Sequence, residues 1–204
     1  MSGVFIVFEG GDGVGKSTQV AMLASLLASR GVHHTVTRQP GGTPLGAKLR
    51  RLILDHGHGD VAPRTEALMY AADKAQHVYE VVAPALERGE VVVCDRYVDS
   101  MIAYQGAGRS LGLDEVALVA GWATGGLLPD LTVLLDADPA DAVEQISIKD
   151  RLESAGVDFH RRARAHLLHL ASKDPERYLI LDARRSREDL ADAIAARVAE
   201  VTGR

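Results

Sequence analysis

The chain has 204 residues, a formal net charge of −5 and a single cysteine, Cys94. This length fits one domain over residues 1–204 with its own hydrophobic core. The negative charge and the lack of a long basic run argue against a nucleic-acid partner, and one cysteine excludes an internal disulfide. The apolar runs are too short to cross a membrane and no signal peptide precedes the first predicted strand, so we expect a cytoplasmic protein.

The first predicted strand leads into a glycine-rich loop. The apolar run Val4–Phe8 is followed by Glu9 and then by a G-x-x-x-x-G-K-S pattern that ends at Ser17. This pattern is typical of a P-loop, in which glycines let successive backbone N–H groups converge on a phosphate. Lys16 is expected to reach the terminal phosphates, and the Ser17 hydroxyl is expected to bind Mg²⁺. The predicted nucleotide-binding residues are Gly10, Gly11, Asp12, Gly13, Val14, Gly15, Lys16, Ser17 and Thr18.

Four further short apolar runs predict buried parallel strands. In chain order they are Thr35–Thr37, Val91–Cys94, Leu131–Leu135 and Tyr178–Leu181. Helical stretches alternate with these runs, which predicts a three-layer α/β fold with a five-stranded parallel sheet flanked by helices. Ligands of such sheets bind at the carboxyl ends of the strands. Charged residues stand at four of these ends, namely Glu9, Asp95, Asp136 and Asp182.

Helical periodicity follows the P-loop and recurs in five later ranges, 45–54, 66–87, 114–122, 158–172 and 187–201. Pro84 is expected to kink the second of these five, and Asp114 is expected to cap the third. The segment His56–Asp60 is expected to be a loop. Its two histidines and one carboxylate are candidate metal ligands, but the glycines between them favour a solvated loop instead.

A P-loop does not by itself distinguish GTPases, ATPases and small-molecule kinases. The chain contains no asparagine, so it lacks the Asn-Lys-x-Asp motif with which a typical GTPase reads its base. ATPases of the ABC and AAA types usually need a longer chain. The third predicted strand ends in Asp95 followed by Arg96, and an arginine at this edge suits a kinase that must neutralise charge on two phosphates brought together.

Several segments, taken together, resemble the bacterial thymidylate kinase family. Besides the P-loop they are Thr37–Thr43, Leu68–His77, Asp95–Gly106 and Leu128–Leu131, and they occur in the family's order. The resemblance implies a P-loop kinase fold and transfer of the γ-phosphoryl group of ATP to dTMP, giving dTDP and ADP with Mg²⁺. It also implies a homodimer and a mobile lid over the nucleotide, here at about residues 139–157.

The resemblance further implies roles for individual residues. Three arginines surround the acceptor phosphate, Tyr70 stacks on thymine, Tyr104 lies against the deoxyribose and Gln105 reaches the pyrimidine edge. The expected substrate-binding residues are Asp12, Arg38, Gln39, Arg50, Tyr70, Lys74, Arg96, Met101, Tyr104 and Gln105. The expected catalytic residues are Lys16, Arg96, Arg151 and Asp12. For three of these residues there are structural alternatives, since Arg50 could be a surface residue, Tyr70 could be part of the core and Arg151 could be a solvated residue at a helix start.

The chain departs from the family pattern at four places. Gln39 stands where the family usually has Glu, Lys74 where it has Arg, and Met101 where it has Ser, Thr or Asn. The lid is poor in arginine, which leaves Arg151, and then Lys149, to stabilise transition-state charge. Because three departures surround the acceptor, we hypothesise relaxed or shifted nucleotide specificity. The alternatives are a kinase for another pyrimidine deoxynucleoside monophosphate and a nucleotide-binding regulator without catalysis.

Overall fold

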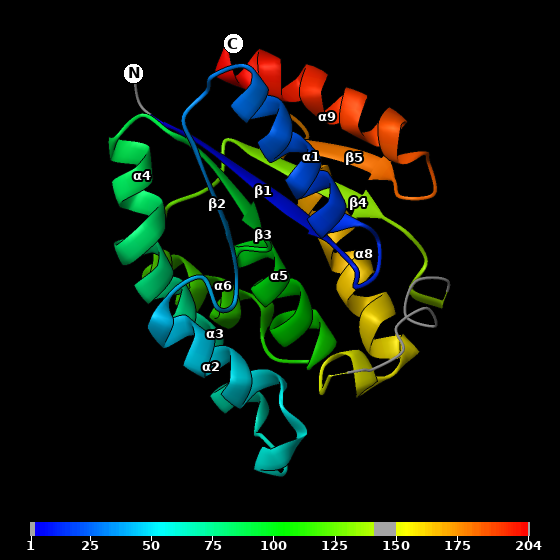
Figure 1. Cartoon of the computed structure of the whole chain (residues 1–204). Coiled ribbons are helices and arrows are strands. Elements are labelled where there is room, and N and C mark those ends of the chain that lie inside the picture. Colours follow the sequence, from blue (N-terminus) through cyan, green and yellow to red (C-terminus); the bar gives the residue numbers. More distant parts are fainter. Residues whose placement is uncertain (1–2, 141–149, 204) are drawn as a thin grey trace.

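A computed structural model describes residues 3–140 and 150–203. A five-stranded parallel sheet forms its centre, with the strand order β2-β3-β1-β4-β5 (Figure 1). The strands are β1 (Val4–Gly10), β2 (His34–Arg38), β3 (Val91–Asp95), β4 (Leu131–Asp136) and β5 (Tyr178–Asp182). All five predicted strands are therefore confirmed, as is the three-layer α/β fold.

Helices cover both faces of the sheet, and the alternation of side chains along β1 shows how. Ile6 and Phe8 pack in one cluster with residues of α1 (Lys16–Ser29) and α9 (Arg187–Thr202). Phe5 and Val7 point the other way, into a second cluster with helices from the middle of the chain. Those helices are α3 (Pro63–His77), α5 (Val98–Met101), α6 (Leu113–Thr124) and α8 (Val157–Lys173). Both faces of β1 are buried, which is why its first five residues, Val4–Phe8, are all apolar.

Six further helical segments complete the described part of the chain. They are α2 (Pro44–Leu54), α4 (Ala83–Glu87), π-helical segments at Val78–Val82 and Ile102–Gly108, and 3₁₀ turns at His56–His58 and Glu153–Ala155. The helix predicted over 66–87 begins earlier, at Pro63, and is interrupted by the first π-helical segment just before Pro84. The prediction that Asp114 caps a helix is wrong, because the N-cap residue of α6 is Gly112 and Asp114 lies in the first turn of the helix.

Three strands bring the site residues to one edge of the sheet. Phe8 of β1 and Arg38 of β2 both lie in register with Asp95, the last residue of β3. Two backbone hydrogen bonds continue this pairing past the strand ends. Arg96 donates to the carbonyl of Phe8 and Gln39 donates to the carbonyl of Asp95, each at 2.9 Å. The P-loop, the turn after β2 and the turn after β3 are therefore held together by the sheet itself.

Candidate active site

The P-loop wraps between β1 and α1, as its glycines predict. Gly10, Gly13 and Gly15 have positive φ angles, and a Cβ at Gly10 would lie 2.3 Å from the carbonyl oxygen of Leu135. The Lys16 ammonium folds back onto the loop and donates to the carbonyl of Gly10 at 3.2 Å and to that of Gly11. Burial and the nearby Arg96 lower the pKa of Lys16 to about 8. A phosphate would replace these carbonyls as the partner of the ammonium group.

Ser17 and Asp95 form a pair of oxygen ligands beside the loop. The Ser17 hydroxyl donates to Oδ2 of Asp95 at 3.1 Å, while Oδ1 of Asp95 is buried without a hydrogen-bond partner. A hydroxyl next to an unsatisfied carboxylate oxygen suits Mg²⁺, which takes few protein oxygens and completes its shell with water and phosphate. The described residues contain no cluster of three or more His, Cys, Asp or Glu side chains that could hold a metal alone. The residues therefore fit a magnesium ion that arrives with a nucleotide.

Arg96 lies at the centre of the site with a strained backbone. Its φ angle is 67°, which non-glycine residues seldom adopt. Its guanidinium pairs with Asp12 of the P-loop, donates to the Ser100 hydroxyl at 3.0 Å and lies 5.2 Å from the centre of the Tyr104 ring. Burial alone would lower the pKa of Arg96, but Asp12 and Tyr104 raise it well above its ordinary value. Arg96 thus stays cationic although it is largely enclosed.

Glu9 holds this turn in place, a role that is not predicted from the sequence. Its fully buried carboxylate accepts hydrogen bonds from the backbone N–H of Tyr97 at 2.8 Å, from the N–H of Ser100 at 3.1 Å and from the Ser100 hydroxyl. Burial and the neighbouring Asp99 carboxylate raise the pKa of Glu9. A chain of contacts therefore runs from Glu9 through Ser100 to Arg96. The only sequence signal for it was a charged residue at the end of an apolar strand.

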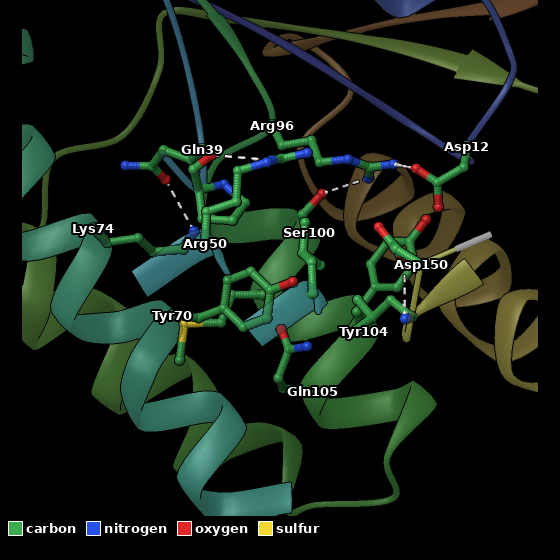
Figure 2. A pocket seen from close by; sticks show the side chains of 14 residues that line it. Asp12, Gln39, Arg50, Tyr70, Lys74, Arg96, Ser100, Tyr104, Gln105 and Asp150 are labelled. Carbon is green, nitrogen blue, oxygen red and sulfur yellow. Dashed lines mark hydrogen bonds and ion pairs between the residues drawn. The ribbon is translucent and has the colours of Figure 1, made fainter. Parts of the chain in front are cut away.

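Two adjoining cavities meet at Arg96. The first, of about 960 Å³, is lined by the P-loop, Arg38, Arg50 and Asp95. The second, of about 510 Å³, holds most of the predicted acceptor residues, and Figure 2 shows its side chains. Its lining includes Asp12, Gln39, Arg50, Tyr70, Lys74, Arg96, Met101, Tyr104 and Gln105. The structure therefore brings together all ten predicted substrate-binding residues, with Asp12, Gln39, Arg50 and Arg96 shared by the two cavities.

Two of the departures from the family pattern, Gln39 and Lys74, contact each other. The Lys74 ammonium donates to Oε1 of Gln39 at 2.9 Å, and both side chains are buried. His77 lies behind them, with Nδ1 at 2.7 Å from Nε2 of Gln39 and Nε2 at 2.6 Å from the Thr37 hydroxyl. Burial and the charge of Lys74 lower the pKa of His77 to about 4, so its ring is neutral and can accept from Gln39. A neutral amide thus stabilises a buried ammonium group where the family has a carboxylate and a guanidinium.

Arg151 lies away from the P-loop in this structure. Its guanidinium pairs with Glu66 on α3 and donates to the carbonyl of Ile53 at 2.8 Å. Glu66 also binds Arg109, at 3.1 Å, and is fully buried. The predicted role of Arg151 at the phosphates stays a prediction, and this arrangement does not support it. Lys149 and the rest of the lid from 141 to 149 lie outside the described residues.

The other predicted residues lie as follows. Arg38 ends β2 beside the phosphate cavity, and Arg50 on α2 donates to the carbonyl of Pro40 at 3.1 Å. Arg50 is therefore not a free surface residue. Tyr70 is buried and also lines the cavity, so the two interpretations of it as a core residue and as a site residue hold together. Met101 is buried in the cavity wall.

Known proteins with sequences similar to this chain include several thymidylate kinases. The family model for thymidylate kinase matches residues 8–194. The thymidylate kinase of Cutibacterium acnes is 56% identical over 204 residues, which is 100% of both chains. That of Clavibacter michiganensis subsp. michiganensis is 55% identical over 201 residues, covering 97% of this chain and 95% of the relative. That of Bifidobacterium longum DJO10A is 51% identical over 205 residues, covering 98% and 100% respectively.

Proposed function

The chain belongs to the thymidylate kinase family. We propose that it binds ATP and dTMP in its two adjoining cavities and transfers the γ-phosphoryl group of ATP to dTMP, giving dTDP and ADP. One observation carries this proposal above all. Arg96 lines both cavities, so a cation stands where a donor phosphate and an acceptor phosphate would meet. Catalysis of phosphoryl transfer depends mainly on the positioning of the two substrates and on positive charge at the transferred group, and the residues of this site can supply both.

In the donor half, the P-loop backbone from Gly10 to Thr18 would bind the ATP phosphates, together with the Lys16 ammonium. Ser17 would hold Mg²⁺, with Asp95 beside it. The ion, when bound, would neutralise part of the negative charge of the nucleotide phosphates. The pKa of Lys16, about 8 in this structure, supports this assignment, because the ammonium has been taken from water without a strong anionic partner. A bound triphosphate supplies that partner.

In the acceptor half, Arg38, Arg50 and Arg96 would bind the dTMP phosphate. Asp12 pairs with Arg96 and would keep its guanidinium pointed at the junction of the cavities. Burial alone would raise the pKa of Asp12, but Arg96 and Lys16 lower it overall, so its carboxylate remains ionised. A carboxylate with a lowered pKa is a weak base, so we assign Asp12 to the orientation of Arg96 and not to proton abstraction.

Five residues would receive the nucleoside of dTMP. Tyr70 would stack on the thymine ring, and Tyr104 would lie against the deoxyribose. Gln105 and Lys74 would contact the edge of the base, with Gln39 supporting Lys74. Met101 would contribute an apolar wall. In the lid, Arg151 or Lys149 would stabilise the charge of the transition state. Arg151 would have to break its ion pair with Glu66 to reach the phosphates.

We also propose a homodimer that acts in the cytoplasm, made of one domain per chain. Three large apolar side chains on α3 and α6 are exposed, Leu68 by 61%, Leu118 by 75% and Trp122 by 84%. These two helices pack against each other, and we propose that a second copy covers these three side chains. No helix among the described residues is long and apolar enough to span a membrane.

A coupled ADP-release assay tests the function. The purified chain is incubated with ATP, Mg²⁺ and one of dTMP, dUMP, dCMP or dGMP. We expect the highest kcat/KM with dTMP. A higher value with another monophosphate would favour a different kinase, and it would support the relaxed specificity suggested by Gln39, Lys74 and Met101. ATP binding without turnover of any monophosphate would favour a regulator.

A further inference from the structure

Glu66 is a buried carboxylate to which the proposed reaction gives no task. It lies on α3 with none of its surface exposed. Arg109 binds it with Nε and Nη2, each at 3.1 Å. Arg151, near the start of the described range 150–203, also pairs with it. Burial alone would raise the pKa of Glu66, but Arg109, Gln105 and Arg151 together lower it. Glu66 is therefore ionised, and an ionised carboxylate can only accept hydrogen bonds.

This fixed acceptor determines how the amide of Gln105 is turned. Nε2 of Gln105 donates to Oε1 of Glu66 at 3.0 Å. The reverse orientation would set two acceptor oxygens against each other inside the protein, which is strongly unfavourable. The amide oxygen of Gln105 is then left for the acceptor cavity, which Gln105 lines (Figure 2). Gln105 therefore presents its amide oxygen, a hydrogen-bond acceptor, to a bound molecule.

Lys74 offers the opposite group in the same cavity. Its ammonium uses one hydrogen for Gln39, at 2.9 Å, and can only donate. The cavity thus presents one fixed acceptor and one fixed donor to the base. A ring N–H next to a carbonyl oxygen, as in thymine and uracil, satisfies both. Cytosine presents a ring lone pair next to an amino group, which opposes both.

We propose that Glu66 is a positioning residue that sets the base specificity of the kinase by locking the Gln105 amide, although Glu66 itself does not line the cavity. This inference rests on the proposed function, in which Lys74 and Gln105 meet the base edge. It places part of the discrimination between thymine and cytosine in a cluster behind the pocket.

The test measures dissociation constants for dTMP, dUMP and dCMP by isothermal titration. Glu66→Gln can accept or donate, so it frees Gln105 to turn and present its NH₂ to cytosine. We expect the ratio Kd(dCMP)/Kd(dTMP) to fall about tenfold, the usual scale for one mismatched buried hydrogen bond. The ratio Kd(dUMP)/Kd(dTMP) should stay within about twofold, because uracil and thymine share the same edge. Gln105→Met should lower the first ratio similarly, and the double variant should lower it no further.

Arg109→Gln is the matched control. It removes one arm of the cluster and should lower the melting temperature, but it leaves the bond between Glu66 and Gln105 and should leave the dCMP ratio unchanged. An unchanged ratio in Glu66→Gln, or an equal fall in Arg109→Gln, would overturn the proposal. If Glu66→Gln does not fold, Glu66→Asp decides. It keeps the charge for both arginines but withdraws the carboxylate from Gln105, so the ratio should fall and an unchanged ratio again overturns the proposal.

Binding constants separate this inference from the proposed function. A wild-type protein that binds dTMP in preference to dCMP but turns over no monophosphate would contradict the kinase assignment and leave the role of Glu66 intact. A protein that phosphorylates dTMP with the same base selectivity in wild type and Glu66→Gln would contradict only the role of Glu66.

Discussion

At the scale of single residues, the site depends on side chains that contact no substrate. Glu9 binds the backbone of the turn in which Arg96 takes its positive φ angle. Such a backbone conformation costs on the order of 1 kcal/mol and persists only where neighbouring groups hold it. Here the Glu9 carboxylate holds it, by accepting hydrogen bonds from the N–H groups of Tyr97 and Ser100. The guanidinium of Arg96 therefore has a fixed direction before any nucleotide binds.

His77 makes the stability of the fold depend on pH. The folded protein keeps His77 neutral down to about pH 4, because the ring is buried next to Lys74, whereas the unfolded chain protonates it near 6.5. The unfolded state then binds more protons between these values, so stability falls as the pH drops from about 6.5 to about 4, by at most ~3 kcal/mol. Chemical denaturation of wild type and His77→Gln at several pH values measures this. The variant should lose less stability over the window, and parallel curves would contradict the prediction.

At the scale of elements, the sequence predicted the strands and most helices because the signals are local. Five apolar runs became five strands, and the P-loop pattern fixed the turn between β1 and α1. The helical stretch from Val98 to Gly108 was missed, because its residues were interpreted as a motif and its π-helical turn breaks the usual periodicity.

The candidate site was predictable where the chemistry lies within a motif, and less so where it depends on packing. The ten predicted substrate-binding residues do line the two cavities. The roles of Glu66 and His77 had no sequence signal, because each is an ordinary polar residue on α3 that acquires its partners only through tertiary packing. The same holds for Arg151, whose pairing with Glu66 joins residues 85 positions apart.

The turn after β2 gives a prediction at this scale. A Cβ at Gly42 would lie 2.6 Å from Cδ2 of His77 and 2.7 Å from the carbonyl oxygen of Arg38. Gly42→Ala should therefore lower the free energy of unfolding by about 1–3 kcal/mol and raise KM for dTMP, because the turn carries Gln39. Gly57→Ala is the control, since nothing lies within 4 Å of a Cβ there. Equal stability of the two variants in urea denaturation would argue against this packing.

At the scale of the whole molecule, the unusual surface is the apolar one on α3 and α6. Replacing both Leu118 and Trp122 with Glu places two charges on this surface without touching either cavity. We expect light scattering coupled to gel filtration to give a dimer for the wild type and a monomer for the double variant. Ile180→Glu, a comparable change on the exposed edge of β5, should remain dimeric. A wild-type monomer would contradict the proposed homodimer.

The whole molecule also explains why one arginine can serve two nucleotides. The sheet brings β1, β2 and β3 to one edge, so the P-loop, Arg38 and Arg96 converge there from distant parts of the chain. The donor cavity and the acceptor cavity share this edge, and Arg96 lines both. We therefore expect Arg96 to stabilise the phosphoryl group during its transfer, and not merely to bind substrate.

The kcat for dTMP in wild type and Arg96→Ala tests that claim most directly, together with the Kd for ATP of each protein. Arg88→Ala, which removes a partly exposed arginine paired with Glu90, is the control. We expect that Arg96→Ala lowers kcat by about 10³ or more, while the Kd for ATP changes only a few-fold. A kcat within about tenfold of wild type would contradict it.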